Sequence, residues 1–123
     1  MLTREEILKR SEILNIKEVV INDQGDTVYV KEMSGADRDA FEQLLVKQIG
    51  TGQDVKFQNA FDNFRGKLCV LSVCDDKGKL LFKPSEYLVF SQSLKAPEID
   101  KIVKASQELN KISEEKLGES VKN

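Results

Sequence analysis

The sequence predicts an α+β fold in which an N-terminal β-hairpin packs with a mainly α-helical body of about four to five helices. Two β-branched runs flank a glycine-containing turn near the start of the chain, which is typical of a hairpin. Apolar residues recur at helical spacing in three later stretches. At 123 residues the chain has the length of one domain, so we expect residues 1–123 to share one core.

The first two elements are a short helix and the hairpin. Thr3 with Glu6 has the spacing of a capping box, which predicts a helix that begins next to Thr3. The β-branched runs at 17–21 and 27–32 enclose the turn that contains Gly25, so the hairpin is predicted over 17–32.

A second helix is predicted over 35–48. Ser34 is a good N-cap, and Asp37 at the third helical position completes a capping box. The segment Gly50-Thr-Gly52 is expected to end this helix.

A central helix is predicted over 57–73, and the rest of the chain is expected to pack around it. Its apolar residues follow one another at steps of four, three, four and three, which places them on one helical face: Phe57, Phe61, Phe64, Leu68 and Leu71. Gly66 interrupts this stretch, and a glycine inside a helix often indicates that another element packs close to the backbone.

The C-terminal part is predicted to be helical. Pro84 begins a helical turn or two that runs through Phe90. Pro97 suits the first position of the next helix, which we expect over 97–110, and a last short helix is expected over 114–121 after Ser113.

Charge and hydropathy narrow the function classes. The net charge is −2 with both signs well mixed, and the absence of a basic stripe argues against nucleic acid as the main partner. No apolar run approaches the roughly 18–20 residues of a membrane span. The first residues also lack the apolar core of a signal peptide, so we expect the protein to stay in the cytoplasm.

The sequence offers little reaction chemistry. It contains no histidine, and its adjacent carboxylates, such as Asp75 and Asp76, fall in predicted turns, so we expect no catalytic residues and no cofactor. A hydrolase that uses Asp75 or Asp76 is kept only as a third hypothesis, after the two functions described below. Cys69 and Cys74 are expected to be reduced and buried rather than paired in a disulfide or bound to a metal, because no Cys-x-x-Cys pair accompanies them.

Four segments resemble the tail assembly chaperones of long-tailed phages and prophages of Gram-positive bacteria. In chain order they are Ser34-Gly-Ala-Asp-Arg-Asp-Ala-Phe41, Asn63-Phe-Arg65, Val73-Cys-Asp-Asp-Lys-Gly-Lys-Leu-Leu-Phe82 and Leu109-Asn-Lys-Ile-Ser-Glu-Glu115. Gly66 and the two cysteines depart from the usual pattern of that family.

The resemblance implies a non-enzymatic protein that coats the helical tape measure protein. It keeps this client soluble in the cytoplasm of the bacterial host until tail tube subunits polymerise around it. The family also self-associates, and contact with the tube protein is a further implied interaction. A small regulatory or nucleic-acid-associated module encoded by a prophage is the alternative function.

A partner-binding surface is predicted on the C-terminal helices, by the helix-in-groove mode. Its candidate residues form a stripe that would cover an apolar stripe on the client: Leu88, Phe90, Ile99, Ile102, Val103 and Leu109. The alternative is that this stripe closes the core of the domain itself, as amphipathic helices usually do.

Overall fold

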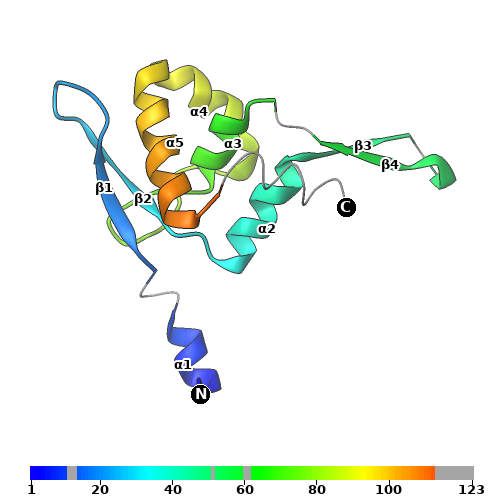
Figure 1. Ribbon diagram of the computed structural model, residues 1–123, viewed down its shortest axis with the longest axis horizontal. Coiled ribbons are helices and arrows are strands. Elements are labelled where there is room, and N and C mark those ends of the chain that lie inside the picture. The colour runs from blue at the N-terminus through cyan, green and yellow to red at the C-terminus, as the bar shows by residue number, and fades with distance from the viewer. Residues whose placement is uncertain (11–13, 51, 60–61, 113–123) are drawn as a thin grey trace.

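The computed structural model describes residues 1–10, 14–50, 52–59 and 62–112, and it confirms the α+β class. The described helices are α1 (Arg4–Lys9), α2 (Gly35–Leu44), α3 (Phe64–Val70), α4 (Tyr87–Ser93) and α5 (Ala96–Asn110), with short helical turns η2 (Gly52–Asp54) and η3 (Pro84–Glu86). The described strands are β1 (Ile16–Val20), β2 (Thr27–Lys31), β3 (Val46–Ile49), β4 (Lys56–Asn59) and β5 (Val73–Cys74). Figure 1 shows a compact body from which α1 and the β3–β4 hairpin project.

The predicted N-terminal hairpin is confirmed. β1 pairs antiparallel with β2, from Ile16 opposite Lys31 to Val20 opposite Thr27. At the turn the side-chain oxygen of Asn22 accepts hydrogen bonds from the backbone N–H groups of Gln24 and Asp26. β5 pairs with the other side of β2, so the sheet has the order β1-β2-β5 and β1 lies at one edge.

The core lies between this sheet and the helices. α5 packs on β1 and β2, and α3 packs on both α4 and α5. Side chains with no more than about 1 % exposure come from the sheet and from the helices α2, α3 and α5 or the residues that follow them, and they include Val30, Phe41, Leu45, Leu68, Leu71 and Ile102. Burying each such side chain contributes roughly 1.5–3 kcal/mol, so the elements are held by one shared apolar core.

Two side-chain amides connect α5 to the hairpin. The Asn110 Oδ1 atom accepts a hydrogen bond of 2.7 Å from the Met33 backbone N–H, and its Nδ2 atom donates to the Lys31 carbonyl at 3.3 Å. At the other end of α5, Asn22 Nδ2 donates to Glu98 Oε2 at 2.7 Å. The start of α5 is therefore fixed to the turn of the hairpin, and its end is fixed to the C-terminal end of β2.

The second helix begins as predicted but ends earlier. The Ser34 hydroxyl accepts from the Asp37 N–H and the Asp37 carboxylate accepts from the Ser34 N–H, which completes the capping box. The prediction that the helix extends to 48 is wrong, because α2 ends at Leu44 and Val46 begins β3.

The prediction of one central helix over 57–73 is wrong. Of the described residues in this stretch, Phe64–Val70 are α-helical, while Lys56–Asn59 pairs with β3 and Val73–Cys74 pairs with β2. The physical interruption is Asn63, whose φ of 60° is left-handed and cannot continue a right-handed helix. Phe61 and the short helix predicted over 114–121 lie outside the described residues.

The prediction for Gly66 is confirmed. A β-carbon at Gly66 would lie 2.6 Å from the backbone carbonyl oxygen of Tyr87 and would overlap the hydroxyl of Ser91. Only glycine allows α3 and α4 to cross at this distance.

Candidate functional site

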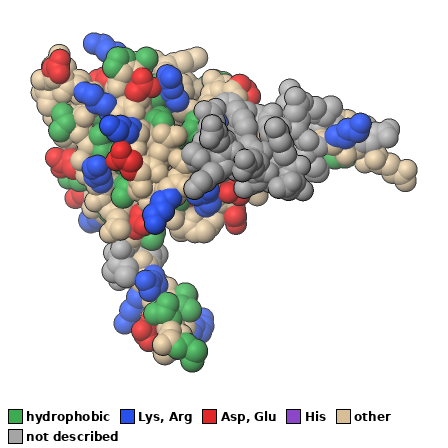
Figure 2. Space-filling model, viewed as in Figure 1, with side chains coloured by type: hydrophobic (Ala, Val, Ile, Leu, Met, Phe, Trp, Pro, Cys, Tyr) green, Lys and Arg blue, Asp and Glu red, His purple; other side chains and the backbone are tan. Residues whose placement is uncertain are grey.

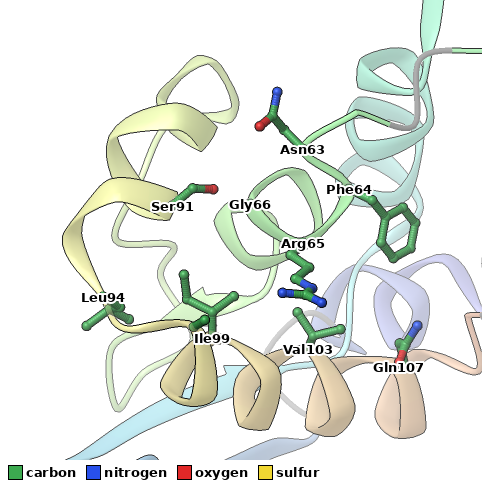
Figure 3. A pocket seen from close by; sticks show the side chains of 10 residues that line it. Asn63, Phe64, Arg65, Gly66, Ser91, Leu94, Ile99, Val103 and Gln107 are labelled. Carbon is green, nitrogen blue, oxygen red and sulfur yellow. The ribbon is translucent and has the colours of Figure 1, made fainter.

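A groove runs between α3, α4 and α5, and it is the best candidate for a binding surface in the described part of the chain. Its volume is about 520 Å³, within the roughly 300–1,000 Å³ typical of ligand sites. Figure 3 shows the side chains that line it. They are Asn63, Phe64, Arg65, Gly66, Ser91, Leu94, Ala96, Ile99, Val103 and Gln107.

The apolar part of the groove comes from three elements. Phe64 of α3 is 8 % exposed and its ring meets that of Phe41 edge to face, with the centroids 5.9 Å apart. Leu94 precedes the N-cap Lys95, and Ile99 is the fourth helical residue, so these two occupy the positions of a hydrophobic staple. Val103 follows Ile99 by one turn on the same face of α5. The result is an apolar strip along the start of α5.

The close crossing of α3 and α4 shapes one wall of the groove. Gly66 contributes backbone only, and the Ser91 hydroxyl donates a hydrogen bond of 2.9 Å to the Tyr87 carbonyl oxygen. Because the Ser91 hydroxyl already donates its proton within α4, it is not free to donate a hydrogen bond to a ligand.

Polar groups flank the apolar strip. Arg65 Nη1 lies 3.2 Å from Asp100 Oδ1, and the two side chains remain 60 % and 55 % exposed. Asn63 is also exposed, and Gln107 is half-buried. An exposed ion pair of this kind contributes little stability, about 0–1 kcal/mol, so its groups can exchange partners at small cost when a ligand arrives.

The described lining of the groove can be compared with the needs of catalysis. Among the lining residues that the structure describes there is no carboxylate, thiol or imidazole that could act as a base for Ser91. Within the described ranges no three Cys, Asp or Glu side chains are placed to hold a metal ion. Asp75, considered above as a hydrolytic residue, instead accepts hydrogen bonds from the Lys77 and Lys79 N–H groups in a turn, which lower its pKa.

The structure separates the six predicted partner-binding residues. Ile99 and Val103 line the groove, although Ile99 is only 5 % exposed. Phe90 and Ile102 are buried in the core at 2 % and 0 % exposure, as the alternative interpretation of the stripe describes. Leu88 is 46 % exposed on α4 outside the groove lining, and Leu109 lies half-buried beside Met33 near the end of α5.

Sequence reasoning missed the two other large apolar residues of the groove, Phe64 and Leu94. The sequence predicts Phe64 on the apolar face of the central helix and not in a binding surface, and it predicts no role for Leu94. A usable signal for Leu94 was its place one residue before the N-cap of a helix with an apolar fourth residue, which is the staple pattern.

The two cysteines lie outside the groove. Cys69 and Cys74 are buried, free thiols. Burial raises the pKa of Cys69 to about 12, and burial also raises the pKa of Cys74. Both thiols therefore stay protonated near neutral pH and pack as small apolar groups.

Comparisons with known proteins place no further constraint on the site. In the part of the chain that the structure describes, every helix is too short or too polar to traverse a lipid bilayer. No family model, no curated protein and no solved structure matches this chain significantly.

Proposed function

We propose that this protein is a non-enzymatic tail assembly chaperone of a long-tailed phage or prophage. It binds the tape measure protein in the bacterial cytoplasm and keeps that client soluble until the tail tube forms around it. The proposal starts from the four sequence segments that resemble this family. The observation that carries it is the α3–α4–α5 groove, where Ile99 and Val103 of the predicted stripe meet Phe64 and Leu94.

The groove suits a helical client. An amphipathic helix presents apolar residues at steps of three and four, and such a stripe matches the apolar strip along the start of α5. The flanking Arg65–Asp100 pair presents one charge of each sign, so it does not select a strongly charged partner. A chaperone that must cover many similar segments of a long client needs this kind of low sequence selectivity.

The experiment is co-expression with the tape measure protein encoded by the same phage or prophage. We expect the client to be soluble and to co-elute with this chain in gel filtration, and to aggregate when expressed alone. Val103→Asp is expected to abolish co-elution, because it places a carboxylate in the apolar strip. The matched control is Leu81→Asp, at a residue that is 57 % exposed and does not line the groove.

Circular dichroism and thermal unfolding of both variants separate lost binding from lost folding. A tape measure protein that stays soluble and monomeric without this chain would contradict the proposal. Retention of binding by a folded Val103→Asp variant would place the client elsewhere on the surface. A gel shift with duplex DNA at low salt would instead support the regulatory or nucleic-acid-associated alternative.

A further inference from the structure

The outer edge of β1 carries backbone groups that no described strand uses. Hydrogen bonds join the Ile21 N–H to the Asp26 carbonyl and the Glu32 N–H to the Asn15 carbonyl. Bonded and non-bonded pairs alternate along an antiparallel ladder, so Lys17 and Val19 also bond to β2. The N–H and C=O groups of Ile16, Glu18 and Val20 therefore point away from β2, toward the open edge.

A groove with an excess of positive charge lies next to this edge. It has a volume of about 280 Å³ and is lined by Lys17, Val19, Val20, Lys101, Lys104, Ala105 and Glu108. The α5 residues in this set follow one another at helical spacing, so they form the face of α5 that is turned toward β1. Three lysines against one glutamate give the groove a net positive charge.

The lysines are available for an incoming partner. Among the described residues, none of the three ammonium groups forms an ion pair with a carboxylate. Glu18, the acidic residue of β1, is paired with Tyr29 in the strand register, and its carboxylate accepts a hydrogen bond from the Tyr29 hydroxyl, which raises the Tyr29 pKa. Glu18 and Tyr29 lie on the sheet face opposite Lys17, because successive side chains alternate between faces.

The outer face of the edge is apolar at both ends. Ile16 and Val20 are 37 % and 54 % exposed, on the same side of the sheet as Glu18. An added strand would therefore meet lysines on the face toward α5 and apolar side chains on the other. On the face that Figure 2 shows, charges of both signs are interspersed over the body.

We propose that β1 accepts an extended acidic segment of another protein as a fourth strand of the sheet. The backbone groups of Ile16, Glu18 and Val20 would supply the ladder hydrogen bonds, and Lys17, Lys101 and Lys104 would select carboxylates on alternate residues. A second copy of β1 fits less well. Antiparallel pairing centred on Glu18 or on Lys17 sets like charges directly opposite each other, which destabilises a ladder, and in any register one copy of β1 offers a single carboxylate to the three lysines.

The test uses a fluorescent synthetic peptide of alternating glutamate and valine with the full-length protein. We expect saturable binding by fluorescence anisotropy that weakens as salt rises, and no binding by the matched peptide with lysine in place of glutamate. Lys104→Glu should weaken binding about tenfold or more. The matched control is Lys56→Glu in β4, an exposed lysine on the projecting hairpin, which should leave binding unchanged.

Amide hydrogen exchange by NMR distinguishes strand addition from simple charge attraction. Bound peptide should slow exchange at Ile16, Glu18 and Val20, and should change Lys17 and Val19 little, because their N–H groups already bond to β2. A peptide of the same charge with alternate amides N-methylated should not bind, because it cannot complete the ladder. This peptide leaves the folding of the protein untouched.

Three outcomes would overturn the proposal. The first is equal binding of the methylated and unmethylated peptides, and the second is equal binding of the acidic and basic peptides. The third is protection of Ile16, Glu18 and Val20 without peptide that rises with protein concentration, which would assign the edge to a second copy. Each is independent of client binding at the α3–α4–α5 groove.

Discussion

Ser91 of α4 lies directly over the backbone of Gly66 in α3, with its hydroxyl where a β-carbon at position 66 would be. Gly66→Ala is therefore expected to destabilise the protein, although alanine is the better helix former by about 0.5–1 kcal/mol. The obstacle that remains after Ser91 rotates is the Tyr87 carbonyl oxygen, which is backbone and cannot move alone. Overpacking of roughly 1–3 kcal/mol should outweigh the helix gain, and urea unfolding measures the net loss.

Gly35 provides the matched control for this substitution. It also lies in a helix, but a β-carbon there would meet nothing within 4 Å. Gly35→Ala should leave the free energy of unfolding unchanged or raise it by up to about 1 kcal/mol. Equal effects of the two substitutions would show that the α3–α4 crossing is not tight.

A charge at Ile102 should unfold the domain, whereas the same charge at Leu88 should not. Ile102 is 0 % exposed in the core, and a buried carboxylate without a partner is strongly unfavourable. Leu88 is 46 % exposed on α4, so Leu88→Glu meets water. Circular dichroism and thermal unfolding of Ile102→Glu and Leu88→Glu make the comparison. A folded Ile102→Glu protein would mean that the stripe on α5 is a surface.

Asn110→Ala should destabilise the protein by roughly 1–3 kcal/mol, because it leaves the Met33 N–H and the Lys31 carbonyl without their side-chain partner. Urea unfolding measures the loss. Gln92→Ala, at an exposed position of α4, is the control and should change stability by less than about 0.5 kcal/mol. A loss at Asn110 no larger than that of the control would contradict the role given to this amide.

Glu98 should make stability depend on acidity. The hydrogen bond from Asn22, together with that from the Lys95 N–H, holds the pKa of Glu98 below its ordinary value of 4.5. Its stabilisation is fully present above the unfolded pKa and is lost as the pH falls through the lower folded pKa. Glu98→Gln keeps an acceptor for Asn22 but cannot titrate, so its free energy of unfolding should fall less on acidification than that of the wild type.

Asp23→Asn is the control for this measurement. Asp23 is an exposed carboxylate in the hairpin turn, so its substitution removes one negative charge but keeps the hydrogen bonds to Glu98. If the free energy of unfolding of Glu98→Gln depends on pH in the same way as that of the wild type, Glu98 does not contribute to the acid dependence.

The two cysteines should resist alkylation in the folded protein. Burial raises the pKa of Cys69 from 9.0 to about 12, so the reactive thiolate is scarce as well as inaccessible. Iodoacetamide should react with the native thiols at least about 100-fold more slowly than in urea. Gln92→Cys gives an exposed thiol in the same protein as the fast reference. Rapid native alkylation of either buried thiol would show that the α3–β5 region opens readily.

The sequence was informative where a local signal and the tertiary structure agree. The hairpin, the Ser34–Asp37 capping box and the start of α5 beside Pro97 all follow from short-range chemistry, and all are found in the structure. Gly66 belongs with them, since a glycine inside a helix has few explanations other than a close neighbour.

The central segment could not be predicted because its apolar spacing is ambiguous. Steps of four and three fit a helix, yet a strand lies at either side of α3: β4 pairs with its neighbour β3, and β5 pairs with the distant β2. Short buried strands have no periodicity that separates them from a helix. The left-handed Asn63 and the glycines at 50 and 52, with φ of 85° and 63°, are the local features that break the helix and shape the β3–β4 hairpin.

The candidate groove was only half predictable for a related reason. The spacing of α5 identifies Ile99 and Val103 as neighbours, but not which face of α5 the sheet covers. Phe64 and Leu94 join them only through the α3–α4 crossing and the staple, and a crossing is a tertiary property. Phe90 and Ile102 share the same helical pattern and end in the core instead.

The amide bridges from the hairpin to α5 span 76 to 79 residues of chain. During synthesis the ribosome must therefore translate past Asn110 before the inner face of the hairpin can be covered. A nascent chain that has emerged only as far as α4 carries Val30 and its apolar neighbours uncovered, and contacts so distant in sequence form late. Completion of the fold thus awaits α5, and ribosomal stalling ahead of it leaves a polypeptide that cellular proteases and holdases can recognise.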